Sequence, residues 1–194
     1  VASDNIVNAS EADAGVTVSG STTAEAGQIV TVTLNSPTVQ TYQATVQADG
    51  SWSINIPAAD LEALTDGSHT LTATVNDKAG NPASTTHNLA VDLTVPVLTI
   101  NTVSGDDIIN AAESGVAQTI SGQVTGAAAG DTVTVTLGGK TYTATVQGNL
   151  SWSVDVPAAD IQAIGNGDLT VNASVTNAVG NTGSGTREDR KSTR

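Results

Sequence analysis

Carboxylate and amide side chains recur at matched places in this sequence, inside stretches that favour turns. Asp4 is matched by Asp106 at a spacing of 102 residues, and Asp107 follows the second of these. The remaining candidates in such stretches are Asp77, Asp92, Asp131 and Asn177. A hard cation such as Ca²⁺ takes about six to eight oxygen ligands, and Asp, Asn and backbone carbonyls in a turn can supply them. The chemistry that these residues could carry out is calcium binding.

Each of these carboxylates could instead belong to a solvated acidic loop that closes an Asx turn on its own backbone. For a single Asp that arrangement is commoner than a metal site. The case for a metal is strongest at Asp92, because negative charge collects there with almost no base nearby. Residues 1–93 carry ten acids and one base, and residues 94–186 carry seven acids and one base.

The overall charge and composition exclude several classes of function. The net charge is −13, which argues against nucleic acid or an anionic membrane surface as a partner, because phosphate recognition needs clustered Lys and Arg. No stretch approaches the roughly 18 apolar residues of a membrane span. Without Cys, the chain has no disulfide, no Cys-ligated metal and no thiol nucleophile.

The sequence offers no repeated catalytic group, so we predict that the protein is not an enzyme. Asp160 could pair with Asp155 for acid–base chemistry, but Asn55 stands in place of Asp155 in the first copy of the repeat. Asp160 instead suits the start of a short helix. His69 and His87 have no counterparts in the second copy, which favours a surface position for both.

The elements that must position the acidic residues come from one module written twice. The stretch Ser51–Leu64 returns almost unchanged as Ser151–Ile164, and it contains both Trp residues of the chain, spaced by 100 residues. Trp52 alternates in phase with Ile54 and Ile56. We therefore expect the Trp rings to pack in the core or at its rim, with the indole N–H bonded locally, rather than at a sugar-stacking surface.

Alternation of Thr with Val and Leu, as in Val30–Leu34 and Val133–Leu137, predicts half-buried strands. About seven such strands in each copy, with turns about every eight to twelve residues, indicate an all-β protein of two tandem immunoglobulin-like sandwiches. We place the first domain at 1–93 and the second at 94–186. Because no Gly or Ser run separates them, we expect a stiff joint.

The last residues, 187–194, differ in composition from the rest of the chain. They hold two acids and four bases and lack the apolar alternation of a closing strand. We therefore expect a vector-encoded or truncated tail that lies outside the second domain.

The predicted topology groups the acidic residues at the domain ends. In an antiparallel seven-stranded sandwich, the chain enters at the end that also carries the loops after the second, fourth and sixth strands. Asp92 could therefore approach Asp131 and Asn177 of the second copy, and the equivalent cluster of the first copy would hold Asp77. The acids of the first loop, Asp4 in one copy and Asp106 with Asp107 in the other, fall at the opposite end.

Three motifs resemble the bacterial Ig-like repeats of giant type I-secreted adhesins, the biofilm-associated protein and large-adhesin group. They are Asp4-Asn-Ile-Val-Asn-Ala-Ser-Glu11, Asp77-Lys-Ala-Gly-Asn81 and Val91-Asp-Leu-Thr-Val-Pro96. The resemblance covers about 1–186. It implies an extracellular stalk on the bacterial surface, in which many repeats hold a binding tip away from the cell and calcium stiffens the joints between neighbouring repeats.

Carried over to this chain, the resemblance makes Asp92 the linker ligand, Asp77 the loop ligand, and Asp4, Asp106 and Asp107 the first-loop ligands. The second copy departs from the pattern, because Asn177 replaces the loop Asp. We expect a monomeric, non-enzymatic spacer that serves cell adhesion or biofilm formation, with any host or biofilm surface bound through other domains. The alternative is an Ig-like module that itself binds a glycan or host protein, which requires exposed aromatic rings.

Overall fold

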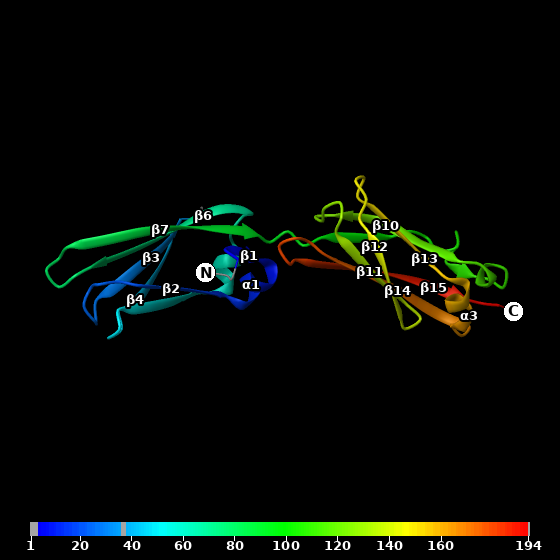
Figure 1. Cartoon of the computed structure of the whole chain (residues 1–194), viewed down its shortest axis with the longest axis horizontal. Helices are drawn as coiled ribbons and strands as arrows, with labels where there is room; N and C mark the ends of the chain where they lie inside the picture. Colours follow the sequence, from blue (N-terminus) through cyan, green and yellow to red (C-terminus); the bar gives the residue numbers. More distant parts are fainter. Residues whose placement is uncertain (1–3, 36–37, 194) are drawn as a thin grey trace. The chain divides into compact units, whose positions relative to one another are not determined.

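The computed structural model describes residues 4–35 and 38–193, and the chain divides into two compact units, Val1–Thr94 and Val95–Arg194. The described part of the first unit contains the strands β1 (Ile6–Asn8), β2 (Val16–Ser21), β3 (Ile29–Asn35), β4 (Gln40–Thr45), β5 (Ser51–Ile56), β6 (Gly67–Asn76) and β7 (Pro82–Asp92). It also has two short helices, α1 (Ala9–Ala14) and α2 (Ala58–Glu62). The strands form a five-stranded sheet, β1-β7-β6-β3-β4, and a two-stranded sheet, β2-β5 (Figure 1).

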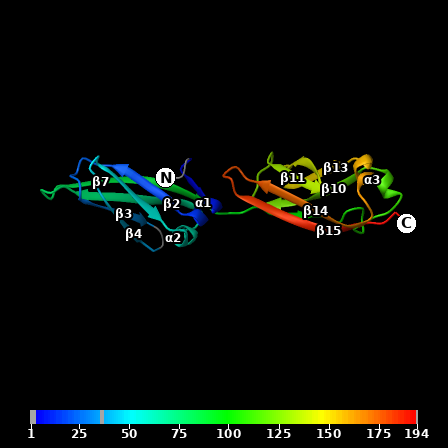
Figure 2. The same cartoon turned by 90° about the horizontal axis from the view of Figure 1, so that it is seen from below.

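The second unit repeats this plan with one additional strand. Its strands are β8 (Val97–Ile100), β9 (Ile108–Ile109), β10 (Gln118–Thr125), β11 (Thr132–Leu137), β12 (Lys140–Thr145), β13 (Ser151–Val156), β14 (Gly167–Thr176) and β15 (Thr182–Lys191). Its helices are the 3₁₀ turn η1 (Glu113–Gly115) and α3 (Ala158–Ala163). One sheet has the order β12-β11-β14-β15-β9 and the other the order β13-β10-β8 (Figure 2). The predicted pair of immunoglobulin-like sandwiches, with about seven strands each, is confirmed.

Alternating side chains form the core, as the sequence predicts. On β3, Val30, Val32 and Leu34 are buried while the Thr residues between them are less buried. The hairpin between β11 and β12 turns at Gly138 and Gly139, both at positive φ, as a two-residue turn requires. The period of two in the sequence therefore determines which face of each strand enters the core.

Both Trp rings lie in the core, at 8% exposure for Trp52 and 1% for Trp152. The expectation of a local hydrogen bond is wrong for Trp152. Its indole Nε1 is buried and has no hydrogen-bond partner among the described residues. The ring packs against the bare backbone of Gly122, where an added Cβ would lie 2.8 Å from the ring. The Trp152 ring is therefore closely packed in a position where its N–H has no hydrogen-bond acceptor among the described residues.

A Tyr–Asp hydrogen bond ties the short helix to the edge strand in both units. Tyr42 Oη donates to Asp60 at 2.6 Å, and Tyr142 Oη donates to Asp160 at 2.9 Å. Burial, followed by the bond to the carboxylate, raises the pKa of Tyr142 to about 12. Lys140 also contacts Asp160 at 2.5 Å. Asp160 therefore not only lies at the start of a helix, as the sequence indicates, but also connects that helix to the edge strand.

The expectation that residues 187–194 lie outside the fold is wrong for the part that the structure describes. Strand β15 continues to Lys191 and pairs with β14 over its whole length (Figure 2). At its end it also pairs with β9. Polar partners replace apolar burial. Lys191 Nζ donates to the carbonyls of Ile161, Gln162 and Ile164, which lie in α3 or just after it. A full backbone ladder and these specific bonds let a charged segment close the sheet.

The expectation of surface positions for both His residues is also wrong in part. His87 is exposed, but His69 is buried on β6 at 8% exposure, and its Nε2 lies 2.8 Å from the carbonyl oxygen of Thr65. A local partner in the preceding loop makes this burial possible. In the described residues, no helix is long and apolar enough to cross a membrane.

Candidate cation-binding loops

Two carboxylates meet the last residues of the first unit. Asp92 ends β7, and its Oδ1 accepts a hydrogen bond from the Thr94 backbone N–H at 3.1 Å. Asp66, in the turn before β6, accepts from the Leu93 N–H at 2.6 Å and from the Thr94 hydroxyl. The hydroxyl bond, followed by the N–H bond, lowers the pKa of Asp66 below its ordinary value. This end of the unit therefore holds several oxygen atoms that could bind a cation, gathered around Thr94.

Asp66 was not among the residues predicted from the sequence. Its counterpart Asn166 also accepts from one backbone N–H and one hydroxyl, but both belong to Thr193, at 3.3 Å and 3.0 Å. The sequence signal is Asp66-Gly67 matched by Asn166-Gly167. An Asx residue before Gly at a repeated position indicates a turn whose side chain can hold a distant backbone segment.

The turns between the long strands use Asp77 and Asn177 alike. Asp77 accepts from the Asn81 backbone N–H and side-chain amide, each at 2.8 Å, and the side-chain bond is the main cause of its lowered pKa. Asn177 Oδ1 accepts from the Asn181 N–H at 2.9 Å. Asp and Asn are thus interchangeable here as acceptors for the turn.

In the second unit, Asp131 and Asn177 lie at the end where β8 begins. Asn177 Nδ2 donates to the carbonyl of Gly126 at 3.4 Å, so the loop after β14 contacts the loop after β10. Next to this contact, Val97 of β8 pairs with Thr125 of β10. Asp131 Oδ2 accepts from the Ala128 N–H at 2.8 Å. Asp131 and Asn177 belong to this unit, whereas Asp92 belongs to the first.

The first-loop acids close tight turns at the end of each sandwich that is opposite to the Asp77 or Asn177 turn. In the first unit this is the end that also carries Asp92, because Ile6 pairs with Ala90 and Asn8 with Asp92. Asp4 accepts from the Ile6 N–H and Asp106 from the Ile108 N–H, both at 3.0 Å. The next residue is in the left-handed region in each copy, at φ 65° for Asn5 and 60° for Asp107. The two loops are therefore built alike, and short Asn and Asp side chains suit this backbone.

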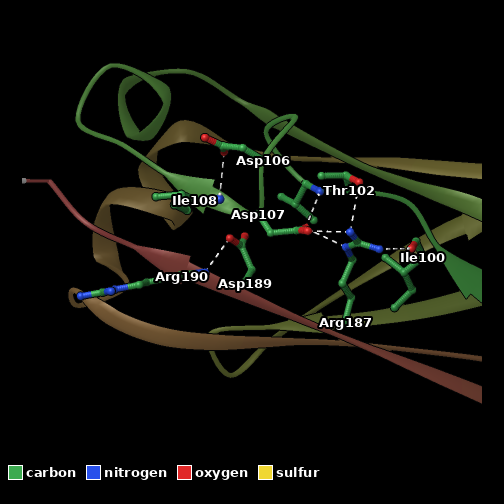
Figure 3. Close-up of polar contacts among 9 residues, drawn as sticks. Ile100, Thr102, Asp106, Asp107, Ile108, Arg187, Asp189 and Arg190 are labelled. Atoms are coloured by element: carbon green, nitrogen blue, oxygen red, sulfur yellow. Dashed lines mark hydrogen bonds and ion pairs between the residues drawn. The ribbon is translucent and has the colours of Figure 1, made fainter.

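Asp107 has a cationic partner that the sequence did not indicate (Figure 3). Arg187 clamps it through two bonds, Nε to Oδ1 at 2.7 Å and Nη2 to Oδ2 at 2.5 Å. The same guanidinium donates to the Ile100 carbonyl at 3.1 Å. This pairing lowers the pKa of Asp107. Because a bidentate guanidinium already neutralises the carboxylate, Asp107 is poorly suited to a metal.

In the first unit, a contact between Asn5 and His87 takes the place of this ion pair. Asn5 Oδ1 lies 3.1 Å from His87 Nε2. His87 pairs with Leu71 across the sheet as Arg187 pairs with Val171, so the two basic residues occupy equivalent positions. His87 therefore does have a structural counterpart, although it is not a His.

The oxygen atoms in these loops are of the kinds that bind calcium, but each loop end offers too few of them for a complete calcium site. In the described parts of the chain, no three His, Asp or Glu side chains come together in a group that could hold a metal ion. The Asp66–Asp92 end offers two carboxylates and a hydroxyl, fewer than the six to eight or so oxygens that calcium takes. A cation bound at this end would need further oxygen ligands.

Comparison with known proteins supports one family. Residues 1–93 match the model of the bacterial Ig-like domain. A solved structure of a Ca²⁺-stabilised adhesin, with which an Antarctic bacterium reaches out and binds ice, is 37% identical over all of this chain, with a TM-score of 0.59. A second, of a 1.5-MDa bacterial ice-binding adhesin, is 35% identical over all of this chain, with a TM-score of 0.56.

The chain spans 48% and 63% of those two structures. A bacterial immunoglobulin-like domain from the ice-binding adhesin of M. primoryensis is 38% identical, with 97% of that domain and 50% of this chain aligned and a TM-score of 0.40. No curated protein matches the sequence significantly. The family match over residues 1–93, the 37% and 35% identities to the two adhesin structures over the whole chain, and the internal repeat show that the chain belongs to the bacterial Ig-like domain family, as a tandem pair of repeats of the kind found in large bacterial adhesins.

Proposed function

We propose that this chain is a non-enzymatic spacer in the stalk of a bacterial surface adhesin, in which calcium at the joints between neighbouring repeats stiffens the rod. The observation that carries the proposal is the convergence of Asp66 and Asp92 on Thr94, the last residue of the first unit. The similar adhesin that is described as Ca²⁺-stabilised supports calcium as the cation.

The proposed calcium ligands are Asp92 and Asp66 in the first repeat, and Asp131 and Asn177 in the second. Asp77 would serve the equivalent loop end of the first repeat, and Asp4 and Asp106 the first-loop ends. Asp107 is left out, because Arg187 already holds its carboxylate. Bound calcium would offset repulsion among the acids. It would favour a straight joint over a bent one only to the extent that it binds the straight state more tightly.

In this function the chain works extracellularly, as a monomer beside further repeats of its own protein. The adhesion or biofilm surface would be bound by other domains. A glycan- or host-protein-binding role for these two repeats would need exposed aromatic rings, whereas both Trp rings are buried.

Calcium binding at the joint is tested by Asp92→Ala. We expect the variant to bind calcium about tenfold more weakly than the parent chain in a calorimetric titration, because a charged oxygen ligand is lost. Asp49→Ala is the matched control. Asp49 lies in the turn before β5, where its Oδ1 accepts from the Ser51 N–H at 3.0 Å, and its removal should leave the affinity unchanged.

Stiffening is tested separately by small-angle X-ray scattering of the full chain with calcium and with a chelator. We expect a broader and shorter distance distribution without calcium, because the joint then gains hinge freedom. The same distribution in both conditions would show that calcium does not stiffen the joint, whatever the titration gives.

A further inference from the structure

The chain enters and leaves the second unit at opposite ends of the sandwich. Strand β8 begins at the end that carries the Asn177 turn, whereas β15 follows that turn and runs to the other end (Figure 2). Strand β9 continues the segment that begins with β8, and it pairs in parallel with β15. The entry segment, residues 97–109, and the exit strand β15 therefore run in the same direction.

This arrangement determines how the unit responds to a stretching force. A force that draws its two ends apart pulls the entry segment backward and β15 forward, each along its own axis. Parallel strands that are pulled in this way slide past each other, so the force strains all the bonds between them at once. Strands that are peeled apart from one end instead lose their bonds one after another. The contacts between the entry segment and β15 are therefore strained together.

Backbone hydrogen bonds form the first part of this contact. The Arg190 N–H donates to the Asp107 carbonyl at 3.1 Å, and the Ser192 N–H donates to the Ile109 carbonyl at 3.0 Å. The first unit pairs β1 with β7 in the same parallel way. Because β9 is only two residues long, however, the backbone alone gives a short connection.

The Arg187 side chain extends the contact along the entry segment (Figure 3). Its Nε and Nη2 bond the two carboxylate oxygens of Asp107 at 2.7 and 2.5 Å. Its Nη1 donates to the Ile100 carbonyl at 3.1 Å, and its Nη2 donates to the Thr102 hydroxyl at 3.0 Å. One guanidinium on β15 therefore bonds the end of β8, the loop that follows and the residue before β9.

Glycines on β15 bring β8 within reach of Arg187. An added Cβ at Gly183 would lie 1.8 Å from the Pro96 carbonyl oxygen, and one at Gly185 would lie 2.7 Å from that of Leu98. The two strands thus pack backbone to backbone, although they belong to different sheets. Arg187, two residues farther along β15, can therefore reach the end of β8.

We propose that the entry segment and β15 form a mechanical clamp, in which β9 pairs with β15 and Arg187 bridges β15 to residues 100–107, and that this clamp sets the resistance of the second unit to stretching. That a stretching force reaches the unit rests on the proposed stalk function. The bidentate bond to Asp107 is the strongest side-chain part of the clamp, because both partners are charged and both carboxylate oxygens are held.

The test is single-molecule unfolding of the full chain at constant force, with a chelator present. One handle is attached at Val95→Cys and the other at the end of the chain, so that only the second unit is stretched; the chain has no other Cys. We expect Arg187→Leu and Asp107→Asn each to unfold about tenfold faster than the parent. The double variant should be little faster than either, because both substitutions remove the same contact.

Lys140→Leu is the matched control. Lys140 and Asp160 also form an ion pair at 2.5 Å, but it joins β12 to α3, which lie between the entry segment and β15 in the sequence. Its loss should leave the unfolding rate under force unchanged, and urea unfolding measures what each substitution costs without force. If Arg187→Leu does not fold, Asp107→Asn decides, because Asn5 already occupies the equivalent position at φ 65°.

Three results would overturn the proposal: no acceleration under force, equal acceleration by Lys140→Leu, or faster unfolding of the Arg187 and Asp107 variants in urea alone. Because the chelator removes calcium from every trace, this test does not depend on calcium at the joints. Unchanged scattering with calcium would therefore refute stiffening and leave the clamp intact. Conversely, failure of the clamp would leave the calcium proposal standing.

Discussion

Replacement of Gly122 by Ala is expected to destabilise the second unit by about 3 kcal/mol. A Cβ at this position would lie 1.8 Å from the Thr99 carbonyl oxygen and 2.8 Å from the Trp152 ring. Neither neighbour can easily move, because Thr99 is in the paired strand β8 and Trp152 is fully packed. The strand β8 must separate from β10, or the ring must shift.

Urea unfolding and hydrogen exchange at the β8 and β10 amides measure this effect. Gly148→Ala is the control, because Gly148 has no atom within 4 Å of an added Cβ, and it should change stability little. Gly20→Ala in the first unit should cost less than Gly122→Ala, since the three atoms nearest its added Cβ all belong to the Trp52 ring, whereas that of Gly122 lies closest to a backbone oxygen. Equal urea midpoints for Gly122→Ala and the parent chain would contradict the packing described for β8.

Replacement of Asp189 by Leu is expected to stabilise the second unit by about 2 kcal/mol near pH 7. Asp189 is 5% exposed, its Oδ1 accepts from the Arg190 N–H at 2.6 Å, and its Oδ2 has no partner among the described residues (Figure 3). At the equivalent position of the first unit, Leu89 is fully buried. The substitution therefore replaces an incompletely bonded carboxylate with a side chain that the fold already accommodates.

The stabilisation should depend on pH in a definite direction. Burial raises the pKa of Asp189 above its ordinary value of 3.8, and the neighbouring charges of Asp107 and Asp106 raise it further, while the Arg190 N–H and Arg187 oppose the shift. In the range just above pH 3.8 the folded state then holds more protons than the unfolded state, so the parent loses stability as the pH rises through that range.

Urea unfolding at several pH values tests this dependence. The stability gap between Asp189→Leu and the parent should be largest near neutral pH and should shrink toward pH 4 or so. Glu188→Leu, on the exposed face of the same strand, is the control and should not show this pH-dependent gap. A gap that stays constant or grows on acidification would show that the folded state does not disfavour the charged form of Asp189.

The acidic loops show how far residue type alone predicts a site. Their positions at the strand ends could be read from the sequence, because turn formation by Asp77 and Asn177 depends on neighbours only a few residues away. The sequence could not show that Asp66 meets Thr94, since 28 residues separate them. Nor could it show that Arg187 holds Asp107 from 80 residues away. Whether a carboxylate is available to a cation depends on such distant partners.

The sequence by itself determined the repeat, the two sandwiches and the inward face of most strands. The alternation of apolar and polar residues is a local property, and successive side chains of a strand point to opposite faces of the sheet. Tertiary structure decided the rest. It made residues 187–191 a closing strand despite their charges, since the bonds that satisfy Arg187 and Lys191 come from a loop and a short helix that are distant in the sequence.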